Sequence, residues 1–382
     1  MKKKDFLFIF FSFLIWRVLL LVIELITINF VPVQNNFLGG GIINYLKAPL
    51  FWGWANFDGE HYISIAQHGY GLGEQAFFPL YPVLIKIIAF LFLEHTGFVH
   101  AVGLIISNIS FFIGLIGFYK LIKIDFSNKI AKICIVFLLL FPTSFYFGST
   151  YTEGLFFSLT VWSFYFARKE NWLSASILGM FASATRVLGV LLAPAFALMI
   201  LKNIKFDFKK IKMKHFYIIL IPFGIFLYMC YLYLGYDDPL LFLKSVRYFG
   251  EQRSTVPIVL PQVFYRYIFK IIPNLNYSYI PVVFTTAMEF VVSSAFLGLA
   301  IYSFFKLNIG YSIYLTLGYI VSTINGSFSS LPRYVLVLFP AFIIVSIWLE
   351  KLPKVWKTVV LVILFVLLAI SQSLFFRGYW IS

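Results

Sequence analysis

The feature that most constrains this chain is a series of long apolar runs. Each run approaches the roughly 20 residues that a helix needs to cross the hydrocarbon core of a bilayer. Only 12% of the 382 residues are charged, whereas soluble domains carry about 25%. This pattern predicts an all-α polytopic membrane protein. The longest runs cover residues 6–30, 98–119, 130–147, 215–234, 280–305 and 358–376.

The positions of the lysines predict how the chain threads the membrane. Lysines gather in short segments between apolar runs, as expected of cytoplasmic loops. Lys2, Lys3 and Lys4 place the N-terminus in the cytoplasm. The first run has no small-residue cleavage site, so it is predicted to be a retained helix and not a signal peptide.

Continuing this alternation along the chain gives about 11 spans in a single domain over residues 1–382, with the C-terminus outside. Two long outer loops are expected, at about 31–97 and 236–280. The short apolar stretch 80–93 is expected to lie at the outer interface of the membrane because it is too short to cross it.

The net charge of +15 does not indicate nucleic-acid binding. A nucleic-acid interface shows basic residues clustered on one face, whereas the lysines here lie in loops that face an anionic membrane surface. Cys134 and Cys230 both lie inside apolar runs. They are predicted to be buried apolar side chains and not a disulfide or a metal site.

A short segment near the start of the first outer loop concentrates ionisable residues. The stretch "FDGEHYISIAQHGY", residues 57–70, contains Asp58, Glu60 and His61, in a chain with only 15 acidic residues and 5 histidines. An acid held in an apolar cavity is a candidate general base. The alternative is a pair of solvated loop carboxylates. The spacing of the histidines matches no standard zinc motif, so no metal is expected.

Three further motifs place charged residues at the ends of apolar runs. Glu153 in "GSTYTEG" is either an ordinary residue of a helix N-terminus or points with Tyr151 into an outer cavity. Arg186 in "ATRVLG" and Arg333 in "SSLPRYVLVLFP" interrupt apolar sequence. A charge there is costly unless it is paired or functional, so Arg186 either pairs with a carboxylate such as Glu153 or binds phosphate.

Taken together and in this order, the motifs resemble the PIG-V mannosyltransferase family of GT-C glycosyltransferases. The segments are "FDGEHYISIAQHGY…AFFPLYP", "PTSFYFGSTYTEGLF", "W…ASATRVLG" and "LPRYVLVLFP", and the resemblance covers roughly residues 51–340. Residues 56–57 are Asn-Phe where the family commonly has a tryptophan. The resemblance implies a GT-C-like bundle that transfers a sugar from a polyprenyl-phosphate donor on the non-cytoplasmic face.

The resemblance also implies roles for individual residues. Asp58 would be the base, with Glu60 or Glu153 assisting. Arg186 and Arg333 would bind the donor phosphate, since arginine is a bidentate phosphate ligand. The residues expected to contact substrate are His61, Tyr62, Tyr151 and Tyr334.

The expected partners are a polyprenyl-phosphate sugar, membrane lipid and an acceptor that is a glycan, a glycolipid or a protein. The sugar would be a hexose such as mannose, and transfer would be inverting. No cofactor is expected, because the donor carries one phosphate and no nucleotide diphosphate.

Three other functions compete with this interpretation. A transporter or flippase of lipid-linked sugars would place ionisable residues near the midplane on broken helices and would show internal repeats. A polysaccharide polymerase or ligase would also use outer-loop arginines. A structural protein without activity is the third. The long acidic first loop favours the transferase.

Overall fold

The structure is a computed structural model that describes residues 1–92, 95–249, 254 and 256–381. Helices make up 79% of it, and the described residues form no strand. The all-helical fold class predicted from the sequence is therefore confirmed. The α-helices are α1 (Lys3–Phe30), α2 (Gly41–Lys47), α3 (Pro49–Trp52), α4 (Asp58–His68), α5 (Leu80–Phe90), α6 (Thr96–Asp125), α7 (Asn128–Leu139), α8 (Glu153–Arg168), α9 (Trp172–Thr185), α10 (Leu192–Asn203), α11 (Phe223–Tyr236), α12 (Leu241–Ser245), α13 (Leu260–Arg266), α14 (Ile280–Lys306), α15 (Ile309–Thr323), α16 (Leu331–Tyr334), α17 (Pro340–Lys351) and α18 (Lys354–Phe376).

Five helical segments of the described chain are long and apolar enough to cross a membrane. These are α1, α6, α14, α18 and the segment Met213–Tyr236, which includes α11. A sixth is possible if the bent pair Leu331–Val337 and Pro340–Lys351 counts as one span, although its two halves meet at 84°. Each of the eleven predicted spans contains a helix. Because several of these helices are too short to cross alone, the count of eleven stays a prediction.

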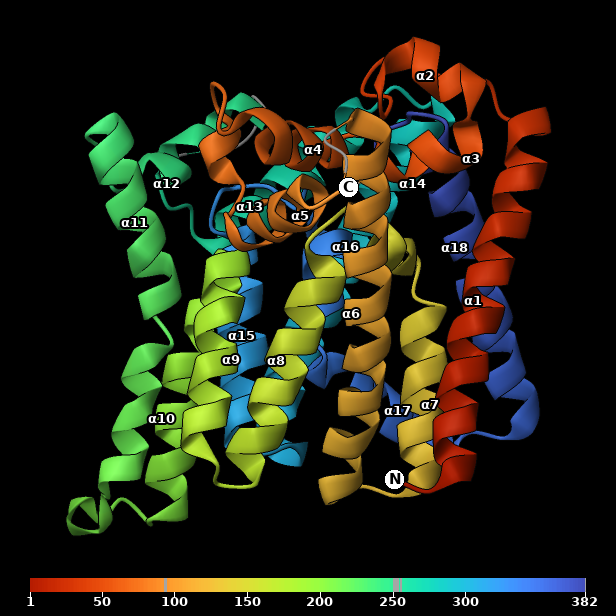
Figure 1. The fold of residues 1–382 in the computed structure, drawn as a ribbon. Helices are drawn as coiled ribbons and strands as arrows, with labels where there is room; N and C mark the ends of the chain where they lie inside the picture. Colours follow the sequence, from red (N-terminus) through yellow and green to blue (C-terminus); the bar gives the residue numbers. More distant parts are fainter. Residues whose placement is uncertain (93–94, 250–253, 255, 382) are drawn as a thin grey trace.

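The long helices run side by side between two ends of the bundle, and α4 and α5 lie across one of these ends (Figure 1). We call this the site end. The chain begins at the opposite end, which we call the N-terminal end. The apolar stretch 80–93 contains the short helix α5, Leu80–Phe90. Residue 93 lies outside the described residues, and the position of the stretch at the outer interface stays a prediction. The short helices α2 and α3, which precede α4, also lie at the site end.

The core around the site depends on a close approach between α6 and α8. Both helices carry small residues where they meet, and Gly154 is the tightest contact. A Cβ atom at Gly154 would lie 2.6 Å from the Ser107 carbonyl oxygen and 2.8 Å from that of Phe147. Because a side chain there would push the two helices apart, Gly154 is what allows α8 to start deep in the bundle. Glu153, the first residue of α8, is consequently fully buried.

Candidate functional site

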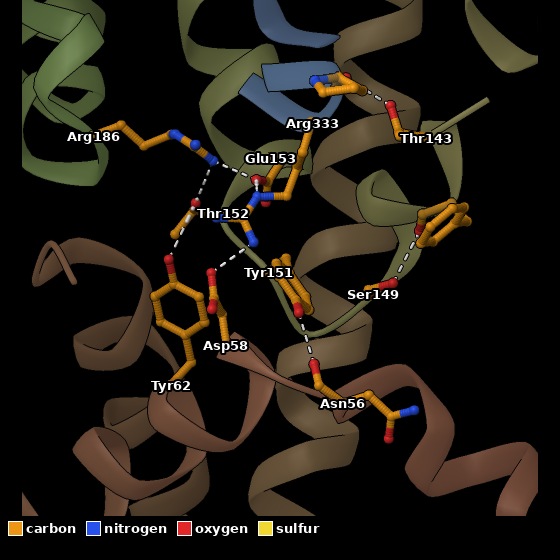
Figure 2. A network of polar contacts seen from close by, with 12 residues as sticks. Asn56, Asp58, Tyr62, Thr143, Ser149, Tyr151, Thr152, Glu153, Arg186 and Arg333 are labelled. Atoms are coloured by element: carbon orange, nitrogen blue, oxygen red, sulfur yellow. Dashed lines mark hydrogen bonds and ion pairs between the residues drawn. The ribbon is translucent and has the colours of Figure 1, made fainter. Parts of the chain in front are cut away.

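Four charged side chains from four distant parts of the chain meet at the site end (Figure 2): Asp58, Glu153, Arg186 and Arg333. Arg333 lies between the two carboxylates. Its Nη1 atom lies 2.6 Å from Asp58 Oδ2, and its Nε atom lies 3.3 Å from Glu153 Oε1. Arg186 Nη1 donates to the same Glu153 oxygen at 2.5 Å. We call these four residues the charge network.

Asp58 is the most accessible carboxylate of the charge network. It is the first residue of α4 and follows Phe57, whose φ of 59° lies in the left-handed region. A bulky residue adopts this conformation only when its surroundings enforce it. Phe57 is held by packing against Phe37 and Phe375. The side chain of Asp58 keeps 16% of its surface exposed, against 1% for Glu153.

The two arginines approach the network from opposite sides. Arg186 ends α9 in an extended conformation and donates a second hydrogen bond to Thr152 Oγ1 at 3.1 Å. Arg333 belongs to α16, whose position is held by a hydrogen bond from Thr143 Oγ1 to the Pro332 carbonyl at 2.8 Å. The residue capping α16, Ser330, again has a left-handed φ, of 63°. Local backbone strain thus precedes both Asp58 and Arg333.

Tyrosine rings surround the guanidinium groups. The Arg333 guanidinium carbon lies 5.1–5.4 Å from the ring centres of Tyr146, Tyr151 and Tyr334. Tyr334 also lies 5.6 Å from the Arg186 guanidinium. Aromatic faces attract cations, so these rings add to the carboxylates in holding the guanidinium groups in place. Tyr334, which the sequence predicts as a substrate contact, is thereby placed between both arginines.

The other predicted contacts lie around the network in different settings. Tyr62 is buried, and its hydroxyl lies 3.4 Å from Thr152 Oγ1. Tyr151 is also buried, and its hydroxyl donates to the Asn56 carbonyl at 2.6 Å. That hydrogen bond ties the segment before α8 to the segment before α4. The hydroxyl of Tyr151 therefore has a structural partner already.

Glu60 and His61 lie beside the network, and in the part of the chain that the structure describes neither forms an ion pair with Arg186 or Arg333. Residues two apart on a helix point in different directions, so Glu60 turns away from Asp58 and accepts from the Gly41 amide at 3.3 Å. Burial raises the pKa of Glu60.

His61 is held by a carboxylate of the same outer loop. Its Nδ1 atom lies 2.9 Å from Glu74 Oε1, and its ring stacks on Phe77. Burial alone would lower the pKa of His61, but the hydrogen bond to Glu74 and the nearby charge of Asp58 outweigh burial and raise this pKa. The His61 side chain is 37% exposed, so its imidazole lies at the edge of the site.

Several residues that build the site were not predicted from the sequence. Asn56 is the most connected: its side chain accepts from the Gly39 amide at 2.8 Å and donates to the carbonyls of Phe375 and Phe376. It thus joins the start of α4 to the end of α18. Thr143, Tyr146 and Thr152 were missed as well. Only the departure of Asn56 from the usual family pattern drew attention to its position.

No group of three or more His, Cys, Asp or Glu side chains in the described chain is arranged to hold a metal ion. The carboxylates of the charge network face arginines instead. The arrangement can hold an anion between two guanidinium groups beside an accessible carboxylate. The structure also contains the ion pair between Arg186 and Glu153. This pair was the alternative to phosphate binding that the sequence left open for Arg186.

Comparison with known proteins identifies the fold. No family model matches the sequence, and no curated protein matches it. ArnT from Cupriavidus metallidurans bound to undecaprenyl phosphate aligns with a TM-score of 0.51 and 13% identity over 96% of this chain and 76% of ArnT. Its apo form aligns with a TM-score of 0.51 and 12% identity over 96% and 72%.

An oligosaccharyltransferase from Archaeoglobus fulgidus aligns with a TM-score of 0.46 and 13% identity, over 94% of this chain and 53% of that protein. The likeness to ArnT confirms the predicted GT-C-like membrane fold. The resemblance to the PIG-V family remains a prediction.

Proposed function

We propose that this protein is a membrane glycosyltransferase that moves a hexose from a polyprenyl-phosphate donor to an acceptor hydroxyl. The observation that carries the proposal is the charge network, in which two buried arginines and an accessible aspartate meet at one end of a GT-C-like bundle. The ArnT structure with undecaprenyl phosphate supports a lipid phosphate as the ligand class.

The two arginines are proposed to bind the phosphate of the donor. Arginine presents a planar set of donors that matches phosphate oxygens. In the structure these donors face Asp58 and Glu153, and the network has two positive and two negative charges. A bound phosphate would compete with Asp58 for Arg333, because Asp58 is the more exposed of the two carboxylates. Donor binding would thus release the carboxylate that chemistry requires.

Asp58 is proposed as the general base. Its carboxylate would take the proton of the acceptor hydroxyl while the oxygen of that hydroxyl forms a bond to the anomeric carbon. The bond from the anomeric carbon to the phosphate oxygen breaks at the same time. The electron pair leaves with the polyprenyl phosphate, whose growing charge Arg186 and Arg333 would stabilise. A single displacement of this kind inverts the anomeric centre.

Glu153 is better suited to positioning than to proton transfer. Its side chain is 1% exposed, and one of its oxygens faces both arginines. A carboxylate in that place fixes where the guanidinium groups point. We therefore assign Glu153 to orienting the two phosphate ligands, and we keep Tyr334 and Tyr62 as candidate contacts for the sugar. Glu60 and His61 would act at the edge of the site.

The site end is proposed to face the non-cytoplasmic side, with the N-terminus in the cytoplasm. The lysine distribution supports this orientation. It is tested with single cysteines, Glu60→Cys at the site end and Phe206→Cys at the N-terminal end, after replacing Cys134 and Cys230. A membrane-impermeant maleimide should label the first in intact cells and the second only after lysis. The reverse pattern would end the proposal.

The activity is tested with purified protein in lipid nanodiscs. Radiolabelled polyprenyl-phosphate mannose, glucose and galactose are each supplied with a membrane extract as the source of acceptor. We expect transfer from at least one of these donors and none from nucleotide sugars. Mannose is the sugar that the PIG-V resemblance favours. Movement of the lipid-linked sugar between leaflets without transfer would indicate a flippase instead.

A further inference from the structure

A second polar site lies on the flank of the bundle, away from the charge network. A cavity of about 320 Å³ opens between α1, α3 and α6, lined by apolar side chains and by two charged ones, Arg17 and Glu24. Cavities of about this volume are large enough for small ligands. On its rim Val18 and Leu21 are about half exposed. Since α1 is one of the candidate spans, this rim faces the bilayer.

Both charged side chains have an unused atom. Arg17 Nη1 and Glu24 Oε2 are buried and have no hydrogen-bond partner among the described residues. The other Glu24 oxygen accepts from Gln372 at 3.0 Å, and the Glu24 side chain is fully buried. A buried polar atom without a hydrogen-bond partner in a membrane-spanning helix is costly, and such atoms usually have a ligand or a partner. The cavity between them is the place for that ligand.

The surroundings hold Arg17 in place without neutralising it. Its guanidinium carbon lies 4.3 Å from the centre of the Trp54 ring. On another side it packs against Gly148, where a Cβ atom would lie 2.3 Å from Nη1. Neither neighbour accepts a hydrogen bond from that nitrogen. Arg17 is thus positioned as a donor for an anion that comes from outside the protein.

The spacing of the two charges restricts the occupant. Arg17 and Glu24 are seven residues apart on one helix, which corresponds to about 10 Å along its axis. An occupant therefore needs an anionic group near Arg17, a cationic donor near Glu24, and apolar chains that continue into the bilayer. A phospholipid headgroup with a phosphodiester and a primary ammonium meets these three conditions.

We propose that this cavity binds the headgroup of an amine-bearing phospholipid, with its phosphate on Arg17 and its ammonium on Glu24. The site does not depend on the proposed transfer reaction. Two of its neighbours, Trp54 and Gly148, belong to the segments that lead into α4 and α8, four residues before Asp58 and five before Glu153. A bound lipid would brace the two segments from which the carboxylates of the charge network extend.

The test measures lipid binding to the intact protein. Wild-type protein in detergent is titrated with phosphatidylethanolamine and with phosphatidylglycerol, and bound lipid is followed by native mass spectrometry and by the shift in melting temperature. We expect phosphatidylethanolamine to be retained and to raise the melting temperature more than phosphatidylglycerol. Equal effects of the two lipids would overturn the assignment of Glu24 to the ammonium. This comparison needs no variant.

Variants then locate the site. Arg17→Gln and Glu24→Gln should each weaken phosphatidylethanolamine binding by about tenfold or more, the usual consequence of losing a charged hydrogen bond. Arg377→Gln is the matched control, because Arg377 already donates to the Val31 carbonyl and should not affect lipid binding. Wild-type binding by both Arg17 and Glu24 variants would overturn the proposal. Equally tight binding of free O-phosphoethanolamine would overturn the assignment to a lipid.

Discussion

Both ends of the bundle carry ion pairs, but the two sets differ in residue type, burial and connectivity. The pairs at the N-terminal end use mainly lysine, for example Lys129 with Glu350 at 2.8 Å and Lys214 with Glu170 at 2.8 Å. Lys129 is 65% exposed in its side chain. In the charge network at the site end, both cations are arginines, their side chains are at most 13% exposed, and the two carboxylates are linked through Arg333.

The difference shows which charges have a high free-energy cost of burial. An exposed pair contributes about 0–1 kcal/mol to the free energy of unfolding, so the exposed pairs at the N-terminal end add little to stability. A buried pair is poor evidence for stability, because apolar residues of the same volume would often serve as well or better. Four charges in one network, each at most 16% exposed in its side chain, are therefore interpreted as retained for chemistry.

The largest effect should come from removing the proposed base. Asp58→Asn keeps the shape of the side chain and loses its proton-accepting oxygen, so transfer should fall by about 10²–10⁴-fold. The measurement is transfer of radiolabelled hexose by purified protein, with a thermal melt to confirm folding. Asp125→Asn, which removes a carboxylate paired with Arg168 at the N-terminal end, is the matched control and should transfer normally. Near-normal transfer by Asp58→Asn would direct attention to Glu60 or Glu153.

The second effect concerns stability. Glu153→Gln leaves two buried guanidinium groups without their shared carboxylate, and the free energy of unfolding should fall by about 3–5 kcal/mol. Glu350→Gln removes the partner of the exposed Lys129 at the other end and should cost much less, because solvent screens that pair. Chemical denaturation in detergent compares the two. Similar losses for both variants would contradict the distinction between the two ends.

The third prediction separates the contribution of the Arg333 charge from that of its planar geometry at the proposed phosphate site. Arg333→Lys keeps the positive charge but cannot reach Asp58 and Glu153 together, because lysine has no planar fork. Losing one preorganised donor of this kind should lower transfer by about 10²-fold. The same change at the N-terminal end, Arg168→Lys, should have no effect on transfer. If Arg333→Lys transfers like wild type, that arginine acts only through its charge.

The sequence was sufficient to identify all four members of the charge network. Asp58 stood out because acids are scarce in this chain, and Arg186 and Arg333 because they interrupt apolar runs where a charge is costly. Which carboxylate meets which arginine was beyond the sequence, since the contacts join segments far apart in the chain. The side chains of Asp58 and Glu60 point in different directions because a helix begins at Asp58 itself.

The number of spans and the residues that connect the segments of the site are harder to predict from the sequence, for a physical reason. Hydropathy measures how apolar a segment is, but a buried helix inside a bundle is as apolar as one that spans the membrane. The short helices α9 and α10 illustrate this ambiguity. Asn56 joins three segments through backbone carbonyls and amides, and such partners leave no pattern in the sequence.

The smallest effect is a pH dependence in the outer loop. The pKa of His61 is raised, so the stabilisation from its pairing with Glu74 is complete below the ordinary histidine value of 6.5 and is lost as pH rises through the raised pKa. The pKa of Glu74 is lowered: burial alone would raise it, but the hydrogen bonds from His61 and from the Gly71 amide outweigh burial. The contribution of Glu74 is therefore lost only as pH falls through a pKa below its ordinary 4.5. Together these shifts place full pairing between about pH 4.5 and 6.5.

The comparison of wild type with Glu74→Gln across pH tests this pairing. Because the His61 side chain is 37% exposed, water screens the pair, and the difference in the free energy of unfolding should be at most about 1 kcal/mol. That difference should be largest near pH 6 and should shrink toward pH 9. Lys244→Gln, which removes an exposed partner of Asp238 in the other long loop, should show no such trend. A difference that grows with pH would mean that Glu74 stabilises the loop through the Gly71 amide and not through His61.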